Sequence, residues 1–495
     1  MAGIIPQSSL QGGIFELVAR GRKDTYFVTD SETSVLPFNS RYESSTPYLK
    51  ERRTTVPLNA PQFGNTFEIE LDKYGDVLLE CNLLIDLPSW LPPLPMVQPS
   101  IAGTQPAPPY QANSTYWVKD ASGYSYGYTK LIGYFLFERI QLYQDSYLLQ
   151  EWSGDGLFAT RASEGSWNSG YLDYQFLGGN DVQTAPPSRS IALRATPGRL
   201  RLSLPLPGLQ GPDDGGLPLC ALPAQSFRLR IKLRSLEDLV ETDAPGDLKP
   251  VPWDPAKTYR YTPSGGSSVY SFKPVDRSAI GQPTILLETV QAYVDADTQH
   301  ALQNNRKAIP FRRMFENIFT MGDLDYKALD RGGVAQVTRR LDGRHPTERI
   351  VWFFRNFNAL CANKYTDLVN GRAPNGQFYS QMKLVIAGRD RELEWGPEVW
   401  QDVENYAKDE IDTGYNIGEM RWTLGDQYEL QRPYTRVPDG TVNFTTADRP
   451  TLHINLNNIF PEVASAQRKA EMRVMTEGWA IYEIAEGRGR LMFAN

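Results

Sequence analysis

Alternating apolar and polar positions dominate the chain. In residues 67–71 three apolar side chains alternate with two glutamates, and in residues 227–234 four apolar side chains alternate with four cations. The same period of two recurs at 200–206 and 452–456. This period predicts β-strands with one buried and one solvated face, and sheets of that kind are usually antiparallel.

Helical patterns are few and short. We predict helices at 155–163, 235–242, 397–410 and 461–472, and the last begins with Pro461 and Glu462, a favourable first turn. The chain is therefore expected to be mostly β, with many short strands.

The order of strands and turns occurs twice. Each copy begins with an aspartate before a turn, Asp72 in the first and Asp342 in the second, and an apolar strand follows, 77–85 and 350–354. A second strand, 140–144 and 382–386, then leads to a Glu-Trp pair that ends at Trp152 and Trp395. A glycine, Gly198 and Gly440, finally opens a further strand in each copy. The spacing from tryptophan to glycine is nearly equal in the two copies. We interpret this as two copies of one β-domain, the first ending after the strand 285–295.

The resulting fold class is all-β, with two tandem eight-stranded antiparallel jelly rolls, long loop insertions and a few short helices. The predicted domains are a first roll at 24–303 and a second roll at 304–495. The first roll has insertions at about 88–130 and 242–283, which are rich in Pro, Gly, Ser and Tyr. Loops of this length are usually functional or exposed.

Composition narrows the class of protein. The 495 residues are 41% hydrophobic, which suits a large core and more than one domain. The net charge of −7 disfavours a protein that coats nucleic acid. Three scattered cysteines and three scattered histidines argue against a disulfide scaffold and a Cys or His metal site. The N-terminus resembles no signal peptide, and the apolar stretch 77–97 is broken by prolines and acids, so a soluble protein of a reducing compartment is expected.

Five motifs, in order along nearly the whole chain, resemble the double jelly-roll major capsid proteins of nucleocytoplasmic large DNA viruses, of the phycodnavirus and iridovirus kind. The motifs are Gly12-Gly-Ile-Phe-Glu-Leu-Val-Ala-Arg-Gly21 followed by Asp24, the turn Tyr74-Gly-Asp76, His345-Pro-Thr347 before Ile350-Val-Trp-Phe353, Asp439-Gly-Thr-Val-Asn-Phe-Thr445, and the terminal Gly487-Arg-Gly-Arg-Leu-Met-Phe-Ala-Asn495. The long insertions depart from the family pattern.

The resemblance implies a structural role without catalysis. Three chains would form a capsomer with a pseudo-hexagonal outline that tiles an icosahedral shell, in a virion assembled in the host cytoplasm. Residues 1–23 would be an inner arm, and the insertions would form towers and clasps. Implied partners are the other chains of the homotrimer, neighbouring capsomers, minor capsid or cement and penton proteins, and inner viral membrane proteins, with no sequence-specific binding of nucleic acid. A minor double jelly-roll paralogue is an alternative.

Two motifs with enzymatic counterparts have simpler structural explanations. Asp295 and Asp297 resemble an aspartyl-phosphate pair, but a strand-end turn is the better interpretation in a chain without a parallel α/β sheet. Ser380 and Lys383 match a Ser-x-x-Lys motif that opens a helix, whereas here the residues run into an alternating strand.

A glycan-binding or glycan-cleaving β-sandwich protein is the alternative from another class. Glu392 and Glu394 would be its carboxylate pair, although an exposed acidic strand face is the better explanation for them. We assign no catalytic, cofactor-binding or metal-ligating residue.

Surface features complete the candidates. Asn113 and Asn443 begin glycosylation sequons, and Asn113 is the candidate for modification, although a chain assembled in the cytoplasm does not meet the secretory machinery. The basic clusters are expected to be solvated faces, with contact to a membrane or cement protein as the alternative: Arg20, Arg22, Lys23; Lys50, Arg52, Arg53; Arg339, Arg340, Arg344. The aromatic residues are predicted to form an interface belt, with a packed tower as the alternative: Tyr110, Tyr116, Trp117, Tyr124, Tyr126, Tyr128, Tyr134.

Overall fold

The computed structural model describes residues 48–90, 118–163, 199–210, 215–244, 249–261, 270–407, 414–422, 440–447, 450–463 and 465–492. They all belong to one compact unit, Tyr48–Asn495. The predicted arm 1–23, Asn113 and the cluster Arg20, Arg22 and Lys23 lie outside the described residues.

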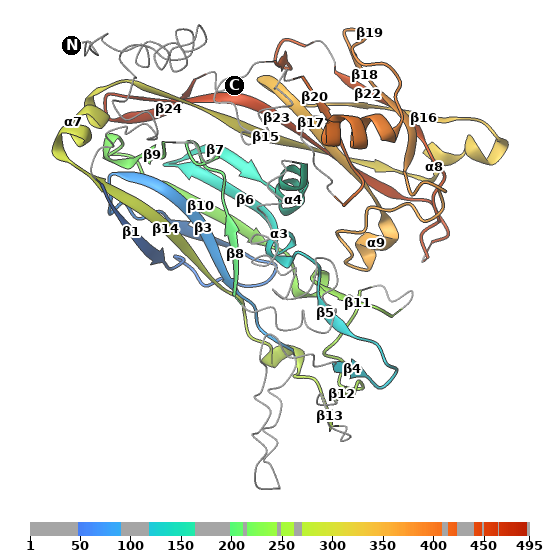
Figure 1. The fold of residues 1–495 in the computed structure, drawn as a ribbon. Helices are drawn as coiled ribbons and strands as arrows, with labels where there is room; N and C mark the ends of the chain where they lie inside the picture. Colours follow the sequence, from blue (N-terminus) through green and yellow to red (C-terminus); the bar gives the residue numbers. More distant parts are fainter. Residues whose placement is uncertain are drawn as a thin grey trace, which may run out of the picture. The chain divides into compact units, whose positions relative to one another are not determined.

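The first roll consists of two antiparallel sheets whose apolar faces share one core (Figure 1). One sheet has the order β1 (Tyr48–Thr55), β14 (Thr284–Val294), β3 (Val77–Asp86), β8 (Arg199–Ser203), with β9 (Leu217–Pro218) also paired to β3. The other has the order β2 (Thr66–Glu70), β10 (Phe227–Leu233), β6 (Phe137–Gln144), β7 (Tyr147–Trp152).

The second roll repeats this arrangement. One sheet has the order β15 (Lys307–Met321), β23 (Ala470–Ala485), β17 (Pro346–Asn356), β20 (Ile417–Arg421), with β21 (Val442–Asn443) paired to β17 and β24 (Arg488–Met492) paired to β23. The other has the order β16 (Ala335–Arg340), β22 (Thr451–Leu456), β18 (Tyr379–Ile386), β19 (Arg389–Asp390). Apart from the additional strand β24, the second roll has the same strand order as the first, which confirms the predicted pair of antiparallel jelly rolls.

The predicted duplication is correct in its strands and turns, with one exception. Trp152 lies opposite Ile140, and Trp395 lies opposite Met382, so the two tryptophans occupy matching positions. The exception is Gly440, which is not the counterpart of Gly198. It precedes β21, and β21 pairs with β17 as β9 pairs with β3. The counterpart of β8 is β20, which the sequence pattern missed because its residues, Ile-Gly-Glu-Met-Arg, do not alternate between apolar and polar.

The helices agree in part with the prediction. The structure has α4 (Gly154–Ser163) and a π-helix, η6 (Val399–Ala407), where helices were expected. Of the helix predicted at 235–242, only a single 3-10 turn is present, η3 (Leu236–Asp238), and β11 follows it. The predicted helix at 461–472 is wrong, because Ala470 begins β23, a central strand hydrogen-bonded to a neighbour on each side.

The other helices were not predicted, and most are one or two turns long. They are α3 (Ile132–Phe135), η2 (Leu219–Ala221), η4 (Arg277–Ala279), α7 (Ala296–Asn304), α8 (Asp323–Tyr326), η5 (Leu329–Arg331) and α9 (Phe357–Cys361). Helix α7 connects β14 to β15, and therefore the two rolls. The division at residues 303 and 304 stays a prediction.

The two insertions of the first roll pair with each other. Strand β5 (Tyr126–Tyr128) pairs with β11 (Val240–Thr242), and β12 (Tyr259–Tyr261) pairs with both β4 (Val118–Asp120) and β13 (Tyr270–Phe272). These strands lie together beyond one end of the first roll (Figure 1). Tyr126 and Tyr128 are buried, so for these two aromatics the packed tower is correct and the exposed interface belt is wrong. Tyr134 is also buried, but it lies in α3, where its ring is 6.3 Å from that of Phe158.

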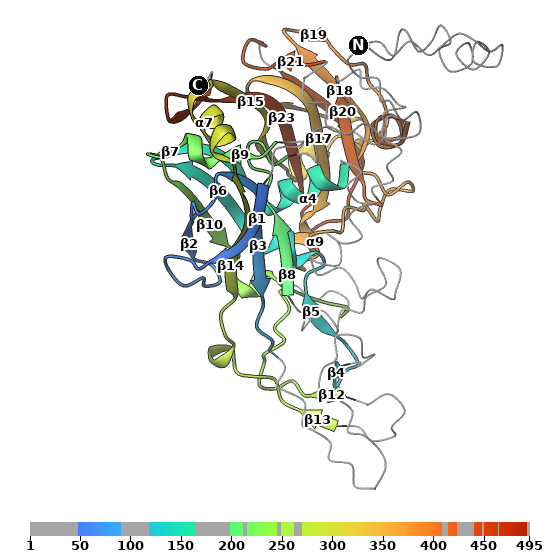
Figure 2. The same ribbon diagram turned by 60° about the vertical axis from the view of Figure 1, so that its left-hand side comes forward.

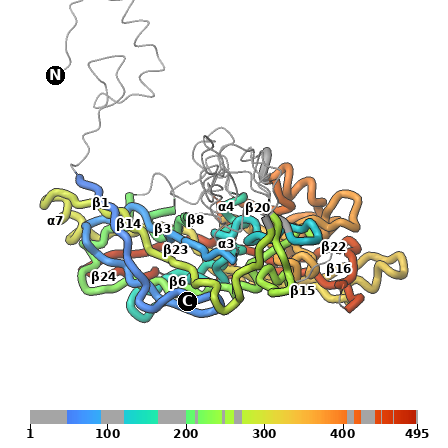
Figure 3. The backbone as a smooth tube through the Cα atoms, turned by 90° about the horizontal axis from the view of Figure 1, so that it is seen from below, coloured from blue at the N-terminus to red at the C-terminus, as the bar shows by residue number. Residues whose placement is uncertain are grey.

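The second roll presents apolar side chains on both faces of its larger sheet. Ile350, Trp352 and Phe354 point into the roll's own core. Val351 and Phe353, which alternate with them, belong to the core of the first roll. The rolls therefore lie side by side (Figure 3), and side chains of both belong to one apolar cluster.

Candidate functional site

The junction between the rolls is centred on helix α4, which belongs to the first roll and lies against β17 and β20 of the second (Figure 2). The helix begins where the chain passes close under α3. A side chain at Gly154 would collide with the carbonyl oxygen of Tyr134, so glycine is required there. Ser153 Oγ accepts a hydrogen bond from the Gly156 amide at 2.8 Å and satisfies one free N–H of the first turn.

Phe158 anchors the helix by apolar contact. It is fully buried, and its ring lies 5.3 Å from that of Phe135, 5.2 Å from that of Tyr415 and 6.5 Å from that of Phe353. The last two belong to the second roll. Aromatic packing of this kind supplies both buried area and a preferred geometry, so this contact fixes how the rolls meet.

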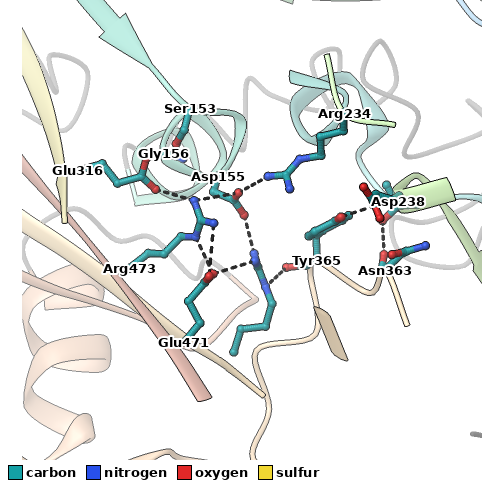
Figure 4. A network of polar contacts seen from close by, with 12 residues as sticks. Ser153, Asp155, Gly156, Arg234, Asp238, Glu316, Asn363, Tyr365, Glu471 and Arg473 are labelled. Atoms are coloured by element: carbon teal, nitrogen blue, oxygen red, sulfur yellow. Dashed lines mark hydrogen bonds and ion pairs between the residues drawn. The ribbon is translucent and has the colours of Figure 1, made fainter. Parts of the chain in front are cut away.

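Asp155, in the first turn of α4, is the centre of a buried ionic network (Figure 4). Its carboxylate accepts hydrogen bonds from Arg234 at 2.6 Å and from Arg355 at 2.7 Å, and lies 3.2 Å from the guanidinium of Arg473. Arg234 is a first-roll residue, whereas Arg355 and Arg473 lie on β17 and β23. One carboxylate therefore links both rolls.

Neighbouring acids balance the remaining positive charge. Arg473 pairs with Glu471 at 2.6 Å and with Glu316 at 2.8 Å, and Arg355 donates to the carbonyl oxygen of Tyr365 at 3.0 Å. The side chains of Asp155 and Arg355 are 0% exposed, so the network lies in a medium where unpaired charge is costly.

The electrostatics favour an ionised Asp155. Burial alone would raise the pKa of its carboxyl, but the attraction of Arg473, Arg355 and Arg234 outweighs burial and holds the pKa well below its usual range. Asp155 therefore stays charged at neutral pH. A permanently ionised carboxylate surrounded by guanidiniums is suited to holding elements together and not to proton transfer.

The far end of α4 is also tied to the second roll. Ser163 Oγ accepts a hydrogen bond from Arg349 on β17 at 3.2 Å. Arg349 in turn is paired with Glu477 and lies 3.6 Å from Glu419. Both ends of the helix are therefore fixed by polar contacts, and the middle is fixed by Phe158.

Two of the family-like motifs meet in the second roll. His345 has a left-handed backbone with φ of 67°, and its amide donates to Thr445 Oγ1 at 2.8 Å. The amide of Phe444 donates to the carbonyl oxygen of His345 at 3.0 Å. Burial, together with the nearby Arg313 and Arg344, lowers the pKa of His345. These motifs therefore form one turn that opens β17.

The enzymatic candidates occupy structural positions. Asp295 directly precedes α7 at the end of β14, as a strand-end turn requires. Ser380 lies on strand β18, where its hydroxyl donates to the carbonyl oxygen of Asn455 at 3.2 Å, and Lys383 of the same strand pairs with Asp390 at 3.3 Å.

The surface candidates are distributed over both rolls. Glu394 lies 3.4 Å from Lys383, in a loop after β19 and not on a strand as expected. Asn443 Oδ1 accepts the amide of Thr445 at 3.0 Å, which gives this sequon residue a structural role. Lys50 lies on β1 and Arg339 on β16, in different rolls.

Among the residues that the structure describes, no group of three or more His, Cys, Asp or Glu side chains is placed to hold a metal ion. No helix of the described chain is long and apolar enough to cross a membrane. The three cysteines are free thiols, and Cys81 is buried.

The sequence analysis did not single out the junction residues. One feature could have identified them: the run Ile350–Phe354 is apolar at every position, which is typical of a strand covered on both faces. Arg349 and Arg355 bracket that run. Cations at the ends of a doubly buried strand predict buried ion pairs, but not which carboxylates form them.

The chain resembles known proteins in its fold and not in its sequence. No protein-family model and no curated protein sequence matches the chain. Solved structures do match. VP54 of PBCV-1, from a crystal structure fitted into a reconstruction of the virophage Sputnik, has 15% identity and a TM-score of 0.66 over 92% of this chain and 100% of that chain.

Two further structures agree. A quasi-atomic PBCV-1 virus capsid matches with 15% identity and a TM-score of 0.61 over 92% of this chain and 100% of that chain. The major capsid protein of Faustovirus matches with 12% identity and a TM-score of 0.59 over 92% of this chain and 94% of that chain. Together with the repeated strand order, these matches establish that the chain has the double jelly-roll fold of these viral proteins.

Proposed function

We propose that the chain is a non-enzymatic major capsid protein that forms trimeric, pseudo-hexagonal capsomers of an icosahedral virion. The observation that carries the proposal is the strand order that the two rolls share, apart from the additional strand β24 of the second roll. Two equivalent rolls in each chain allow three chains to present six similar edges, which is what a flat hexagonal lattice requires. The solved structures with this fold are named as viral capsid proteins, which supports the same role.

The junction between the rolls supports a structural role for the chain. A buried network that joins α4 to β17 and β23 holds the two rolls in one fixed relation, and a lattice subunit needs that rigidity. The same network offers no poised acid, base or nucleophile. We therefore propose no catalytic activity and no cofactor.

The proposed partners follow from the same role. They are two further copies of the chain, neighbouring capsomers, minor capsid or cement and penton proteins, and proteins of an inner viral membrane. The chain would be made in the host cytoplasm and reside in the virion. Quantifying the chain in purified virions would separate a major protein from a minor double jelly-roll paralogue, and the intact mass of the same material would test glycosylation at Asn113.

The direct test is the native mass of the purified chain by multi-angle light scattering. A stable trimer has three times 55.9 kDa and should bury more than about 2,000 Å² at each subunit contact. Negative-stain images of the same sample should show particles with a hexagonal outline. A folded monomer at high concentration would contradict the proposal.

A further inference from the structure

Matching positions in the two rolls differ sharply in exposure. Trp152 of the first roll is 2% exposed, whereas its counterpart Trp395 in the second roll is 44% exposed. Two residues earlier, Gln150 is 2% exposed and Leu393 is 61% exposed. A large apolar side chain at a position that is buried in the equivalent domain indicates a surface that a partner covers.

The second roll is what covers these positions in the first. Gln150 Nε2 donates to the carbonyl oxygen of Arg312 on β15 at 3.1 Å. Trp152 lines a small cavity together with Arg312 and Met314 of β15. We call the edge of each roll that carries Trp152 or Trp395 its tryptophan edge. The chain thus contains one complete contact of this kind, in which the tryptophan edge of the first roll packs against β15, the first strand of the second roll.

The strand that receives the tryptophan edge, β15, also has a counterpart in the first roll, and that counterpart is exposed. Strand β15 of the second roll corresponds to β1 of the first roll. The β-bulges of β3 and β17 fix how the residues of the two strands align. Lys50 therefore occupies the position of Arg312, and Arg52 occupies the position of Met314. Arg312 is buried, whereas most of β1 is exposed, including Lys50 and Arg52. Among the residues that the structure describes, therefore, neither the tryptophan edge of the second roll nor β1 of the first roll has the covering that its counterpart has.

The two uncovered surfaces are electrostatically complementary. On β1, the cations Lys50 and Arg52 point to one face, and Glu51 and Arg53, which pair with each other at 2.7 Å, point to the opposite face. Arg52 also lies 3.7 Å from Glu80 and from Glu288 of the neighbouring strands. Residues 392–404 contain no lysine or arginine, and their carboxylates are Glu392, Glu394, Glu398, Asp402 and Glu404. Glu398 is exposed and follows Trp395 by three residues, as Asp155 follows Trp152. Opposite charges on facing patches favour association and fix its register.

We propose that the segment Leu393–Glu404 of one copy docks on β1 of a second copy, and that this contact repeats the internal junction between the rolls. Trp395 lies against Lys50 and Arg52 of the other chain, and Leu393 lies over its backbone near Lys50. The contact joins two different surfaces, so it propagates around a ring and closes when the rotation allows. The inference rests on the proposed trimer and names the surfaces that build it.

Charge reversal tests the pairing. The variants K50E/R52E and E394K/E398K should each raise the concentration at which the trimer dissociates at least tenfold, measured by mass photometry over a dilution series. Combining all four substitutions restores opposite charges across the contact, so trimer formation should recover. Arg230→Glu, an exposed strand arginine on the other sheet of the first roll, is the matched control and should not change the dissociation. Circular dichroism verifies that each variant is folded.

A disulfide test does not depend on those variants. If Leu393 lies over Lys50 of another copy as Gln150 lies over Arg312, then K50C/L393C should form inter-chain disulfides under oxidised glutathione and give covalent trimers on a non-reducing gel. The single variants K50C and L393C are the controls and should stay monomeric on that gel.

The outcomes separate the two proposals. A wild-type chain that is monomeric overturns the proposed capsomer itself. A wild-type trimer that is unaffected by either charge reversal and yields no covalent trimers overturns only this contact. A wild-type trimer that dissociates with each reversal, recovers with the combination and cross-links through residues 50 and 393 establishes it.

Discussion

Replacing Asp155 by asparagine removes a carboxylate of α4 that is paired with arginines of both rolls. The amide has the same shape but no charge, so the change isolates the ionic contribution. Arg355 keeps only Glu471, at 3.6 Å, and a carbonyl oxygen, whereas Arg473 keeps two close carboxylates. Removing one partner from a buried ion pair typically costs about 3–5 kcal/mol, and the acids left around Arg473 place this variant near about 3 kcal/mol.

The pH dependence gives this prediction its sign. The pKa of Asp155 is lowered on folding, so its stabilisation is complete above the ordinary aspartate pKa of about 3.9 and is lost as the pH falls below it toward the folded-state value. The difference in unfolding free energy between wild type and Asp155→Asn should therefore be constant from pH 7 to about pH 5. It should narrow below about pH 4.

Urea denaturation followed by tryptophan fluorescence measures this difference, at one fixed protein concentration because association shifts apparent stability. Asp342→Asn is the control, since the Asp342 side chain is 85% exposed and lies 3.9 Å from Arg340. Its midpoint should match that of wild type. An Asp155→Asn midpoint equal to wild type at pH 7, or a difference that persists undiminished at pH 3, would refute the reasoning.

Three further predictions concern the junction and the first core. Phe158→Ala should lower the unfolding free energy by about 3–5 kcal/mol in the same urea assay, because it empties a fully buried site that touches Phe353 of the other roll; an effect below about 1 kcal/mol would contradict this packing. Gly154→Ala should lower the unfolding free energy by about 1–3 kcal/mol, measured by calorimetry, because the added methyl group meets the backbone of Tyr134. An unchanged melting temperature would instead show that α4 can shift freely. Cys81 should resist Ellman's reagent at pH 8 until the chain unfolds, because burial raises the pKa of its thiol to about 12; labelling of all three cysteines in the native protein would contradict its place in the core.

Local pattern determined the strands of this protein and their grouping into two rolls. The period of two in 67–71, 227–234 and 452–456 decides which side chains can be buried, and each of these segments is a strand with that alternation. The order of turns and tryptophans is repeated in both halves, and this repetition predicted the duplication. These features depend on neighbours in sequence, so the sequence alone is sufficient to predict them.

Tertiary structure decided what the pattern could not express. Residues 461–472 have a favourable helix start, yet pairing on both sides draws Ala470 into β23, and long-range hydrogen bonds outweigh local propensity. Asp155, Arg355 and Arg473 are far apart along the chain, and only the packing of α4 on the second roll brings their charges together. The same packing makes Trp152 buried and Trp395 exposed, although their local sequences are alike, because burial depends on which other surface is present.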